Sequence, residues 1–430
     1  MNQNSQSTNF SGLGIAPAFL ETLARLNYKN PTPIQQQAIP VAIQGKDVVG
    51  IAQTGTGKTL AFGIPMIQRL QQIKERGLVV LPTRELAIQV DEVLRRIGGS
   101  LGLRTAVLIG GTPIGPQIRA LARNPHIIIA TPGRLNDHLN QKTARLDKTR
   151  IVVLDEADRM LDMGFAPQIQ KIFQVLPRDR QTMLFSATMP SEIMKLATAY
   201  MKLPIRIEVA VSGTTVERVT QEIFIISKDA KIRLVEKLLR QYLGTTLIFT
   251  RTKHGAKRLA RAIRDLGHTA TEIHSNRSLN QRRDALAGFK SGRYRVLIAT
   301  DIASRGLDVT GIELVINFDL PTNAEDYVHR IGRTARAGAG GHAISLVAPD
   351  QRRELRDIER LVRKQLPISQ LPELPPARAP KFPPINHYRS SRPNRPPRRH
   401  PRTSKDLLRN KFSSRNLNRG PGWFNRGTVN

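Results

Sequence analysis

Short, mostly apolar runs alternate along the chain with longer segments of helical periodicity. The runs are three to five residues long, and runs of this kind favour strands that are buried on both faces of a sheet. Helical segments between such runs are typical of parallel sheets covered by helices. The predicted strands are Val48–Ile51, Leu78–Leu81, Ile127–Ala130, Ile151–Leu154, Met183–Phe185, Thr246–Phe249, Val296–Ala299, Leu314–Phe318 and Ala343–Val347.

A polar, turn-prone stretch divides these strands into two series. It runs from Glu208 to Val219 and contains Ser212-Gly213-Thr214-Thr215, and such residues favour turns. We therefore predict an α/β fold with two tandem domains, each a parallel sheet flanked by helices. The predicted boundaries are residues 1–208 for the first domain, 209–218 for a linker, 219–366 for the second domain and 367–430 for a tail.

The charge points to a polyanionic partner. The 430 residues include 67 Lys and Arg against 34 Asp and Glu, a net charge of +33. No basic amphipathic helix or lipidation motif is evident, so nucleic acid is favoured over a membrane surface. Between Pro376 and Asn430, 14 Lys and Arg face one acid, Asp406. This Pro- and Arg-rich composition predicts a disordered tail, which either binds RNA or only solubilises the chain.

Features that the sequence lacks exclude several classes of protein. The chain has no Cys, which excludes disulfides, a thiol nucleophile and Cys-ligated zinc. The opening MNQNSQSTNF is polar and does not resemble a signal peptide. No stretch approaches the roughly 18 apolar residues that a membrane-spanning helix needs. We therefore expect a soluble, cytoplasmic protein without membrane association.

A glycine-rich loop follows directly on the predicted strand Val48–Ile51. Its glycines let the backbone wrap closely, so that successive N–H groups face phosphates. Lys58 is placed to reach the β- and γ-phosphates, and the Thr59 hydroxyl is placed to ligand Mg²⁺. The strict pattern begins with Gly where this chain has Ala52. The predicted nucleotide-binding residues of the loop are Ala52, Gln53, Thr54, Gly55, Thr56, Gly57, Lys58 and Thr59.

Two further clusters supply the chemistry of phosphoryl transfer. The strand Ile151–Leu154 delivers Asp155 to hold Mg²⁺ and Glu156 to orient and deprotonate the attacking water. Arg333 and Arg336, from the second domain, are placed to stabilise the γ-phosphate in the transition state. The predicted catalytic residues are Lys58, Glu156, Arg333 and Arg336.

Along residues 10–350 the order of these motifs resembles the DEAD-box RNA helicase family, including the literal sequence Asp155-Glu156-Ala157-Asp158. The resemblance implies two RecA-like domains, ATP and Mg²⁺ as cofactors, and RNA as partner. It implies that Gln35 binds the adenine edge, which would favour ATP, and that Phe10 stacks on the ring. Further implied residues are Gly306 and Asp308 for ATP, and Ser186, Thr188 and His329 for coupling hydrolysis to unwinding.

The same resemblance implies a series of RNA contacts that read the backbone and not the bases. One loop departs from the family, because His274-Ser275 stands where His-Gly is usual and Leu279 replaces the Gln of Gln-x-x-Arg. The implied RNA-binding residues are Pro82, Thr83, Arg84, Gly111, Thr131, Arg134, Thr252, Arg282 and Thr300.

The predicted function is RNA-stimulated ATP hydrolysis, coupled to domain closure and to local, sequence-independent unwinding of RNA. The short N-terminus and basic tail favour a bacterial RhlE-like subgroup, whose relatives serve ribosome assembly, RNA turnover or cold acclimation. Protein partners in such processes are not specified by the sequence. Two alternatives stay open: a processive translocase of a neighbouring helicase group, and a non-enzymatic RNA chaperone that acts through the tail.

Overall fold

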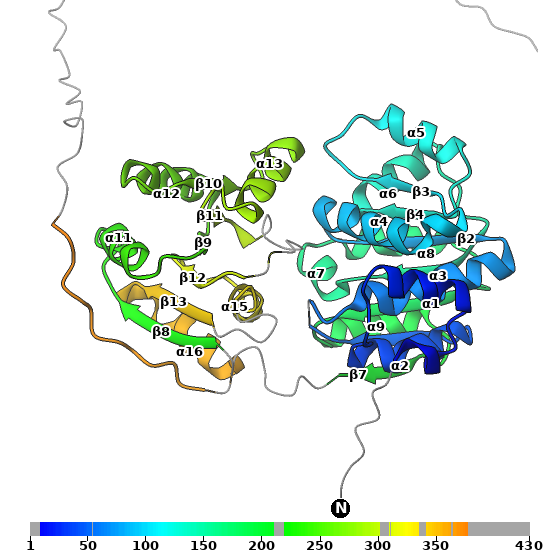
Figure 1. The fold of residues 1–430 in the computed structure, drawn as a ribbon, viewed down its shortest axis with the longest axis horizontal. Coiled ribbons are helices and arrows are strands. Elements are labelled where there is room, and N and C mark those ends of the chain that lie inside the picture. The colour runs from blue at the N-terminus through cyan, green and yellow to red at the C-terminus, as the bar shows by residue number, and fades with distance from the viewer. Residues whose placement is uncertain are drawn as a thin grey trace, which may run out of the picture. The chain divides into compact units, whose positions relative to one another are not determined.

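Two separate parallel sheets form the framework of the protein (Figure 1). The computed structural model describes residues 9–53, 55–209, 219–301, 309, 311–334, 341–362 and 364–376. All of these belong to one compact unit, residues 1–377. Within this described part of the chain, no helix is long and apolar enough to cross a membrane.

The first sheet has seven parallel strands in the order β3-β4-β2-β5-β6-β1-β7. In register, Ile51 pairs with Ser186 and Val80 pairs with Leu154, so the carboxyl ends of these strands lie along one edge. The strands are β1 (Val48–Ile51), β2 (Arg76–Val80), β3 (Thr105–Leu108), β4 (Ile127–Ala130), β5 (Thr149–Leu154), β6 (Gln181–Ser186) and β7 (Ile205–Glu208).

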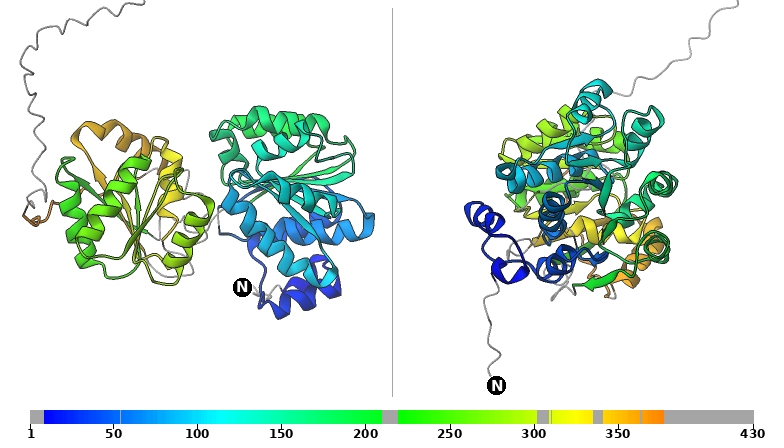
Figure 2. Two further views of the ribbon diagram at one scale, coloured as in Figure 1. Left: turned by 90° about the horizontal axis from the view of Figure 1, so that it is seen from above. Right: turned by 90° about the vertical axis from the view of Figure 1, so that its right-hand side faces the viewer.

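Helices cover both faces of this sheet (Figure 2). One face packs beneath η1 (Phe10–Leu13), α1 (Pro17–Arg25), α2 (Pro33–Ile43), α3 (Lys58–Ile73) and α4 (Arg84–Gly98), and their buried side chains form one apolar cluster. The other face packs beneath α6 (Pro132–Asn140), α7 (Ala157–Asp162), α8 (Ala166–Val175) and α9 (Ser191–Tyr200). The helix α5 (Ile114–Ala122) lies next to β3. Burial on both faces explains the continuous apolar runs of the central strands.

The second sheet has six parallel strands in the order β10-β11-β9-β12-β13-β8. The strands are β8 (Val219–Ile225), β9 (Thr246–Phe249), β10 (Ala270–Ile273), β11 (Val296–Ala299), β12 (Leu314–Asn317) and β13 (Gly341–Val347). One face packs against α11 (Lys231–Gln241) and α12 (Lys253–Asp265). The other packs against α13 (Leu279–Lys290), α15 (Ala324–Ile331) and α16 (Arg352–Val362). A short helix, η3 (Pro349–Gln351), precedes α16.

All nine predicted strands are present, and the α/β prediction of two sheets flanked by helices is confirmed. The prediction of a disordered tail from residue 367 is wrong for its first part. Pro367 accepts a hydrogen bond from Ile223 N–H at 2.9 Å, and Ser369 N–H donates to Ile223 O at 2.9 Å. Pairing with the backbone of β8 therefore fixes this segment, a contact that its composition does not reveal. Residues 377–430 lie outside the described part.

Candidate functional site

The phosphate loop bridges β1 and α3 at the carboxyl edge of the first sheet. Gly55 and Gly57 have φ of +86° and +90°, a left-handed conformation that glycine adopts without strain. The helix α3 begins directly after Gly57, so its free N–H groups face the loop. The Lys58 ammonium donates to Ala52 O at 2.8 Å and is buried. Thr59 follows it and is partly exposed, and Thr54 lies outside the described residues.

Gln35 ties the segment before α2 to this loop. Its Oε1 accepts from Thr32 N–H at 2.9 Å, and its Nε2 donates to Gly57 O at 3.0 Å. A side chain at position 57 would collide with Gln35, because a Cβ there would lie 2.3 Å from Nε2. Gln35 therefore sits beside the phosphate loop as the prediction requires. Phe10, by contrast, is only 4% exposed and belongs to the apolar cluster that includes α2 and α3.

The two acids predicted for catalysis follow β5 and are both buried. Glu156 has φ of 53° and ψ of 49°, a conformation that costs a non-glycine residue about 1–2 kcal/mol. Asp155 Oδ1 accepts from Glu156 N–H at 2.9 Å. The Glu156 carboxylate is paired with Arg159 at 2.6 Å, and this pair is 2% and 5% exposed. Strain of this kind is typical of functional sites.

Asp158 joins this segment to β6, at whose end Ser186-Ala187-Thr188 lies. Its Oδ2 accepts from Ala187 N–H at 3.0 Å, from Thr188 N–H at 2.9 Å and from the Thr188 hydroxyl at 3.1 Å. In addition, Asp158 N–H donates to Ser186 Oγ at 3.3 Å. The structure thus brings the predicted coupling residues Ser186 and Thr188 together with the acidic segment.

Burial and neighbouring charges shift the pKa values of the buried acids in different directions. Burial raises the pKa of Asp155 to about 6, although Lys58 opposes the shift, and the Glu156 carboxylate adds to it. Burial alone would raise the pKa of Glu156 as well, but Arg159 and Lys58 outweigh it and hold that pKa below its ordinary value. Lys58 and backbone N–H groups likewise lower the pKa of Asp158 against the effect of burial. At neutral pH Glu156 is therefore charged, as a general base must be.

Side chains of α15 and its C-terminal end approach the acidic segment. His329, Arg330 and Arg333 line one small cavity together with Arg159, and the charge of Arg333 contributes to the low pKa of Glu156. Burial and Arg159 lower the pKa of His329 to about 3, so its imidazole is neutral. The structure thus places Arg333 and His329 beside Arg159 of the acidic segment, and their catalytic and coupling roles stay predictions. Gly306, Asp308 and Arg336 lie outside the described residues.

Arg330 was not predicted as a site residue, yet it binds several groups at the carboxyl edge of the second sheet. Its guanidinium is 2% exposed and binds Asp301 through two contacts of 2.6 and 2.8 Å. It also donates to Asn317 Oδ1 at 3.1 Å and to Asp319 O at 2.6 Å. A bidentate pair of this kind fixes geometry as well as charge. It holds Asp301 and the adjacent Thr300 at the end of β11.

The predicted RNA contacts of the first domain converge at the carboxyl edge of its sheet. Arg84 lies against Gly111, where an added Cβ would be 1.9 Å from Nη1. Arg134 Nη1 donates to Thr112 O at 3.1 Å. Thr83 and Thr131 are the N-caps of α4 and α6, so each stands at the positive end of a helix. Pro82 precedes Thr83 and is buried.

The predicted RNA contacts of the second domain occupy the matching edge. Thr252 is the N-cap of α12, and its hydroxyl accepts from Gly255 N–H at 3.0 Å. Arg282, on α13, is paired with Glu85 of α4 at 3.0 Å, and the two side chains are 11% and 7% exposed. Leu279, which departs from the family pattern, is 8% exposed and belongs to the apolar cluster of α2, α3 and α4.

Two of these contacts lie beyond sequence reasoning. Arg159 and Glu85 carry no signal that separates them from ordinary helical polar residues. The spacing of Glu156 and Arg159, three residues apart, suits an ion pair on a helix and is the one available hint.

Two parallel α/β domains, a phosphate loop and a buried acid pair at the carboxyl edge define the class of RecA-like nucleotide hydrolases. The family described as DEAD/DEAH box helicase matches residues 32–196, and the helicase conserved C-terminal domain matches residues 230–338. The chain belongs to the DEAD-box family, and it is an ATP-dependent RNA helicase.

Curated relatives agree with this assignment. The ATP-dependent rRNA helicase RRP3 of Debaryomyces hansenii is 43% identical over 84% of this chain and 76% of its own length. The DEAD-box ATP-dependent RNA helicase CshA of Bacillus cereus is 43% identical over 85% of this chain and 70% of its own.

Solved structures share the fold. Dbp5 of S. cerevisiae, bound to RNA and ADP BeF3, has a TM-score of 0.75 at 29% identity, over 85% of this chain and 95% of that one. Mss116p bound to ssRNA and AMP-PNP has a TM-score of 0.79 at 27% identity, over 86% and 81%. These neighbours support RNA as the partner of this chain.

Proposed function

We propose that this helicase couples ATP hydrolysis to closure of its two domains over RNA, with the residue roles predicted from the sequence. The observation that carries the proposal is the approach of Arg333 to the buried Glu156. Glu156 activates the water, while Arg333 and Arg336 stabilise the transferred phosphoryl group. Because these groups come from different domains, hydrolysis depends on closure.

Magnesium fits the acidic edge. Asp155 is buried beside two other carboxylates, and burial raises its pKa although Lys58 opposes the shift. Asp155 and the Thr59 hydroxyl would hold a divalent cation, which would supply positive charge beside the phosphates. Among the described residues no cluster of three His, Cys, Asp or Glu side chains is placed to hold an ion. An ion held partly by nucleotide phosphates does not require one.

ATP binding rests on the phosphate loop and Gln35. Gln35 hydrogen-bonds to Gly57 O, and this position beside the phosphate loop supports the proposal that its side chain binds the adenine edge. Lys58 would exchange its bond to Ala52 O for the phosphates. The buried Phe10 packs in the apolar cluster that includes α2. Stacking of its ring on adenine remains our prediction. Gly306 and Asp308 complete the proposed site from the second domain.

RNA is gripped through its backbone, without base reading. The helices α4, α6 and α12 each begin with a Thr at the carboxyl edge, where N–H groups favour phosphates. Arg84 and Arg134 flank the Gly111 loop, and Thr300 and Arg282 extend the surface in the second domain. Each ligand binds the closed form better, so ATP and RNA affinities are reciprocally coupled. A bent single strand in the closed groove then excludes a continuous duplex.

The finer cellular assignment is also a proposal. We propose that the chain belongs to a bacterial RhlE-like subgroup and acts in the cytoplasm, and its basic C-terminal segment supports this. The relative RRP3 is an rRNA helicase, which supports work in ribosome assembly.

The test is the steady-state ATPase rate with and without single-stranded RNA. For wild type we expect strong stimulation by RNA. Glu156→Gln keeps the shape of the side chain and removes the base, so the stimulated rate should fall by about 10²–10⁴-fold, while nucleotide binding stays. Glu192→Gln, at an exposed position in α9, is the matched control and should behave as wild type. A wild-type rate that ignores RNA, or a Glu156→Gln rate equal to the control, would overturn the proposal.

A further inference from the structure

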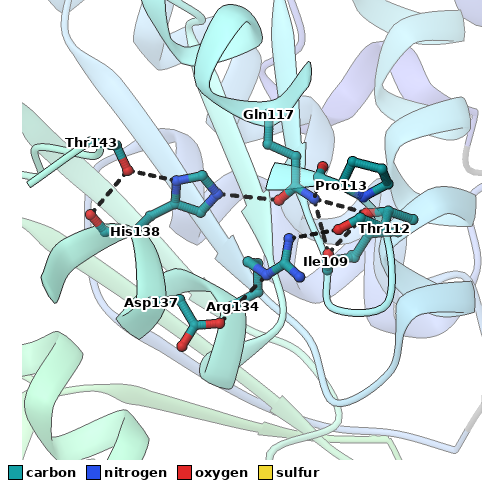
Figure 3. A network of polar contacts seen from close by, with 8 residues as sticks. All are labelled: Ile109, Thr112, Pro113, Gln117, Arg134, Asp137, His138 and Thr143. Carbon is teal, nitrogen blue, oxygen red and sulfur yellow. Dashed lines mark hydrogen bonds and ion pairs between the residues drawn. The ribbon is translucent and has the colours of Figure 1, made fainter. Parts of the chain in front are cut away.

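A buried polar network binds Ile109 and Thr112, the residues on either side of Gly110-Gly111 (Figure 3). The loop connects β3 to α5 and is spanned by the side chain of Gln117, on α5. Gln117 Nε2 donates to Ile109 O at 3.0 Å, to the Thr112 hydroxyl at 2.8 Å and, more weakly, to Pro113 O at 3.4 Å. One amide thus closes the loop on both sides of its two glycines.

The amide orientation of Gln117 follows from its neighbours. The carbonyls of Ile109 and Pro113 can only accept hydrogen bonds, so the NH₂ group must face them. Its Oε1 therefore faces His138 Nε2, which lies 3.2 Å away. An oxygen there can only accept, so His138 carries its proton on Nε2. His138 Nδ1, left as an acceptor, lies 2.8 Å from the Thr143 hydroxyl.

His138 is well suited to this role because it is neutral and immobile. Its side chain is fully buried. Burial, and then Arg134, lower its pKa, although Asp137 opposes the shift. A chain of contacts therefore runs from Thr143 through the imidazole to the Gln117 amide and the loop. Such a network costs energy if any member is removed, because its partners stay buried and unpaired.

The loop connects in turn to the two arginines proposed to bind RNA. Thr112 O accepts from Arg134 Nη1 at 3.1 Å, and Arg134 Nε lies 3.5 Å from Asp137 Oδ2. On the other side, Gly111 has φ of +72° and touches the Arg84 guanidinium. The position of the loop therefore sets where both guanidinium groups stand.

We propose that Gln117 and His138 are positioning residues for RNA binding, which fix the Gly111 loop and thereby the spacing of Arg84 and Arg134. The inference rests on the proposed RNA-binding role of those arginines. Neither Gln117 nor His138 touches RNA, because both are buried beneath the loop. The network lies outside the phosphate loop and the acid pair, so it acts on RNA affinity and leaves the chemical step alone.

The experiment titrates single-stranded RNA into the ATPase assay. We expect Gln117→Leu and His138→Leu to raise the half-saturating RNA concentration at least about fivefold, the cost of roughly 1 kcal/mol of misplaced contact. The rate at saturating RNA and the KM for ATP should stay within about twofold. His138→Gln can still present an N–H near the Nε2 position, so it should restore near-wild-type RNA affinity. Arg134→Gln should weaken RNA binding, and combining it with Gln117→Leu should give less than the sum.

His126→Leu is the matched control for lost stability. His126 Nδ1 accepts from Arg104 N–H at 3.0 Å at the start of β4, the opposite edge of the same sheet. The His126→Leu variant should have a lower Tm and an unchanged half-saturating RNA concentration. If wild type shows no RNA stimulation, the proposed function fails. If wild type is stimulated but the network variants match His126→Leu in RNA half-saturation, the positioning role is wrong. Should Gln117→Leu not fold, the comparison of His138→Leu with His138→Gln decides the same question.

Discussion

Asp155 and Glu156 are adjacent and both buried, yet the pKa of Asp155 is raised and the pKa of Glu156 is lowered. Arg159 gives Glu156 an ion-pair partner at 2.6 Å, whereas Lys58 only partly offsets the effect of burial on Asp155. These different surroundings suit the roles that we propose for the two residues, a Mg²⁺ ligand for Asp155 and an ionised general base for Glu156.

The raised pKa of Asp155 predicts a pH-dependent stability. The folded protein holds a proton up to about pH 6, while the unfolded chain releases it near pH 3.9. Stability from this group therefore falls as the pH rises through that window. Asp155→Asn removes the penalty, so in Mg²⁺-free buffer it should raise the unfolding free energy more at pH 7.5 than at pH 5, by on the order of 1 kcal/mol. Thermal melts of both proteins at the two pH values measure this, and a pH-independent difference would contradict it.

At the scale of elements, the strand–Thr–helix unit recurs at the functional edge. It appears where β2 leads to α4, β4 to α6 and β9 to α12. Each Thr is the extended N-cap residue of the helix that follows. The Thr83 and Thr252 hydroxyls accept a backbone N–H of that helix, so the same residue caps the helix and stands beside the free N–H groups at its start.

Thr252 allows these two roles to be separated. Thr252→Asp keeps a capping oxygen for Gly255 N–H, so we expect the unfolding free energy to change by less than about 0.5 kcal/mol. Its negative charge beside RNA phosphates should raise the half-saturating RNA concentration about tenfold or more. Thr252→Ala should show the opposite pattern. It should lower the unfolding free energy by about 1 kcal/mol and change the half-saturating RNA concentration less. Denaturant melts and RNA titrations provide both readouts. Equal RNA affinity in Thr252→Asp and wild type would remove this site from the RNA surface.

At the scale of the whole molecule, one turn of α13 meets the first domain through two contacts. Arg282 pairs with Glu85, and Leu279 joins the apolar cluster of the first sheet. An apolar side chain at this position strengthens domain contact without needing RNA. In the domain closure that we propose, Leu279 in place of the family's usual Gln contributes apolar contact.

Leu279→Ala tests that use. Loss of about 2 kcal/mol or more of apolar contact should disfavour the closed arrangement and lower the RNA-stimulated ATPase rate at subsaturating ATP several-fold. Leu286→Ala, on the same helix and packed against the second domain's own cluster, is the control. It should reduce Tm with a smaller effect on the ATPase rate. A Leu279→Ala enzyme with wild-type ATP and RNA dependence would show that the contact is dispensable.

The order of residues is sufficient to predict the class of fold and the central strands, and it is the basis of the roles that we propose at the nucleotide edge. Central strands are buried on both faces, so they appear as apolar runs, and all nine predicted strands exist. The four strands that it missed, β3, β7, β8 and β10, are the four edges of the two sheets. An edge strand has a solvated side and alternates apolar with polar residues, as in β7 with Ile205, Arg206, Ile207 and Glu208.

Only the tertiary structure decided which polar residues act together. The phosphate loop and acid pair are contiguous motifs, and local backbone rules suffice to predict them. The pairs Arg330–Asp301 and Gln117–His138 join separate elements, and the pair Glu156–Arg159 lies within one helix start, but all three depend on burial and on side-chain orientation. Their composition is that of ordinary helical surface residues, and it is packing that excludes water and makes each contact specific.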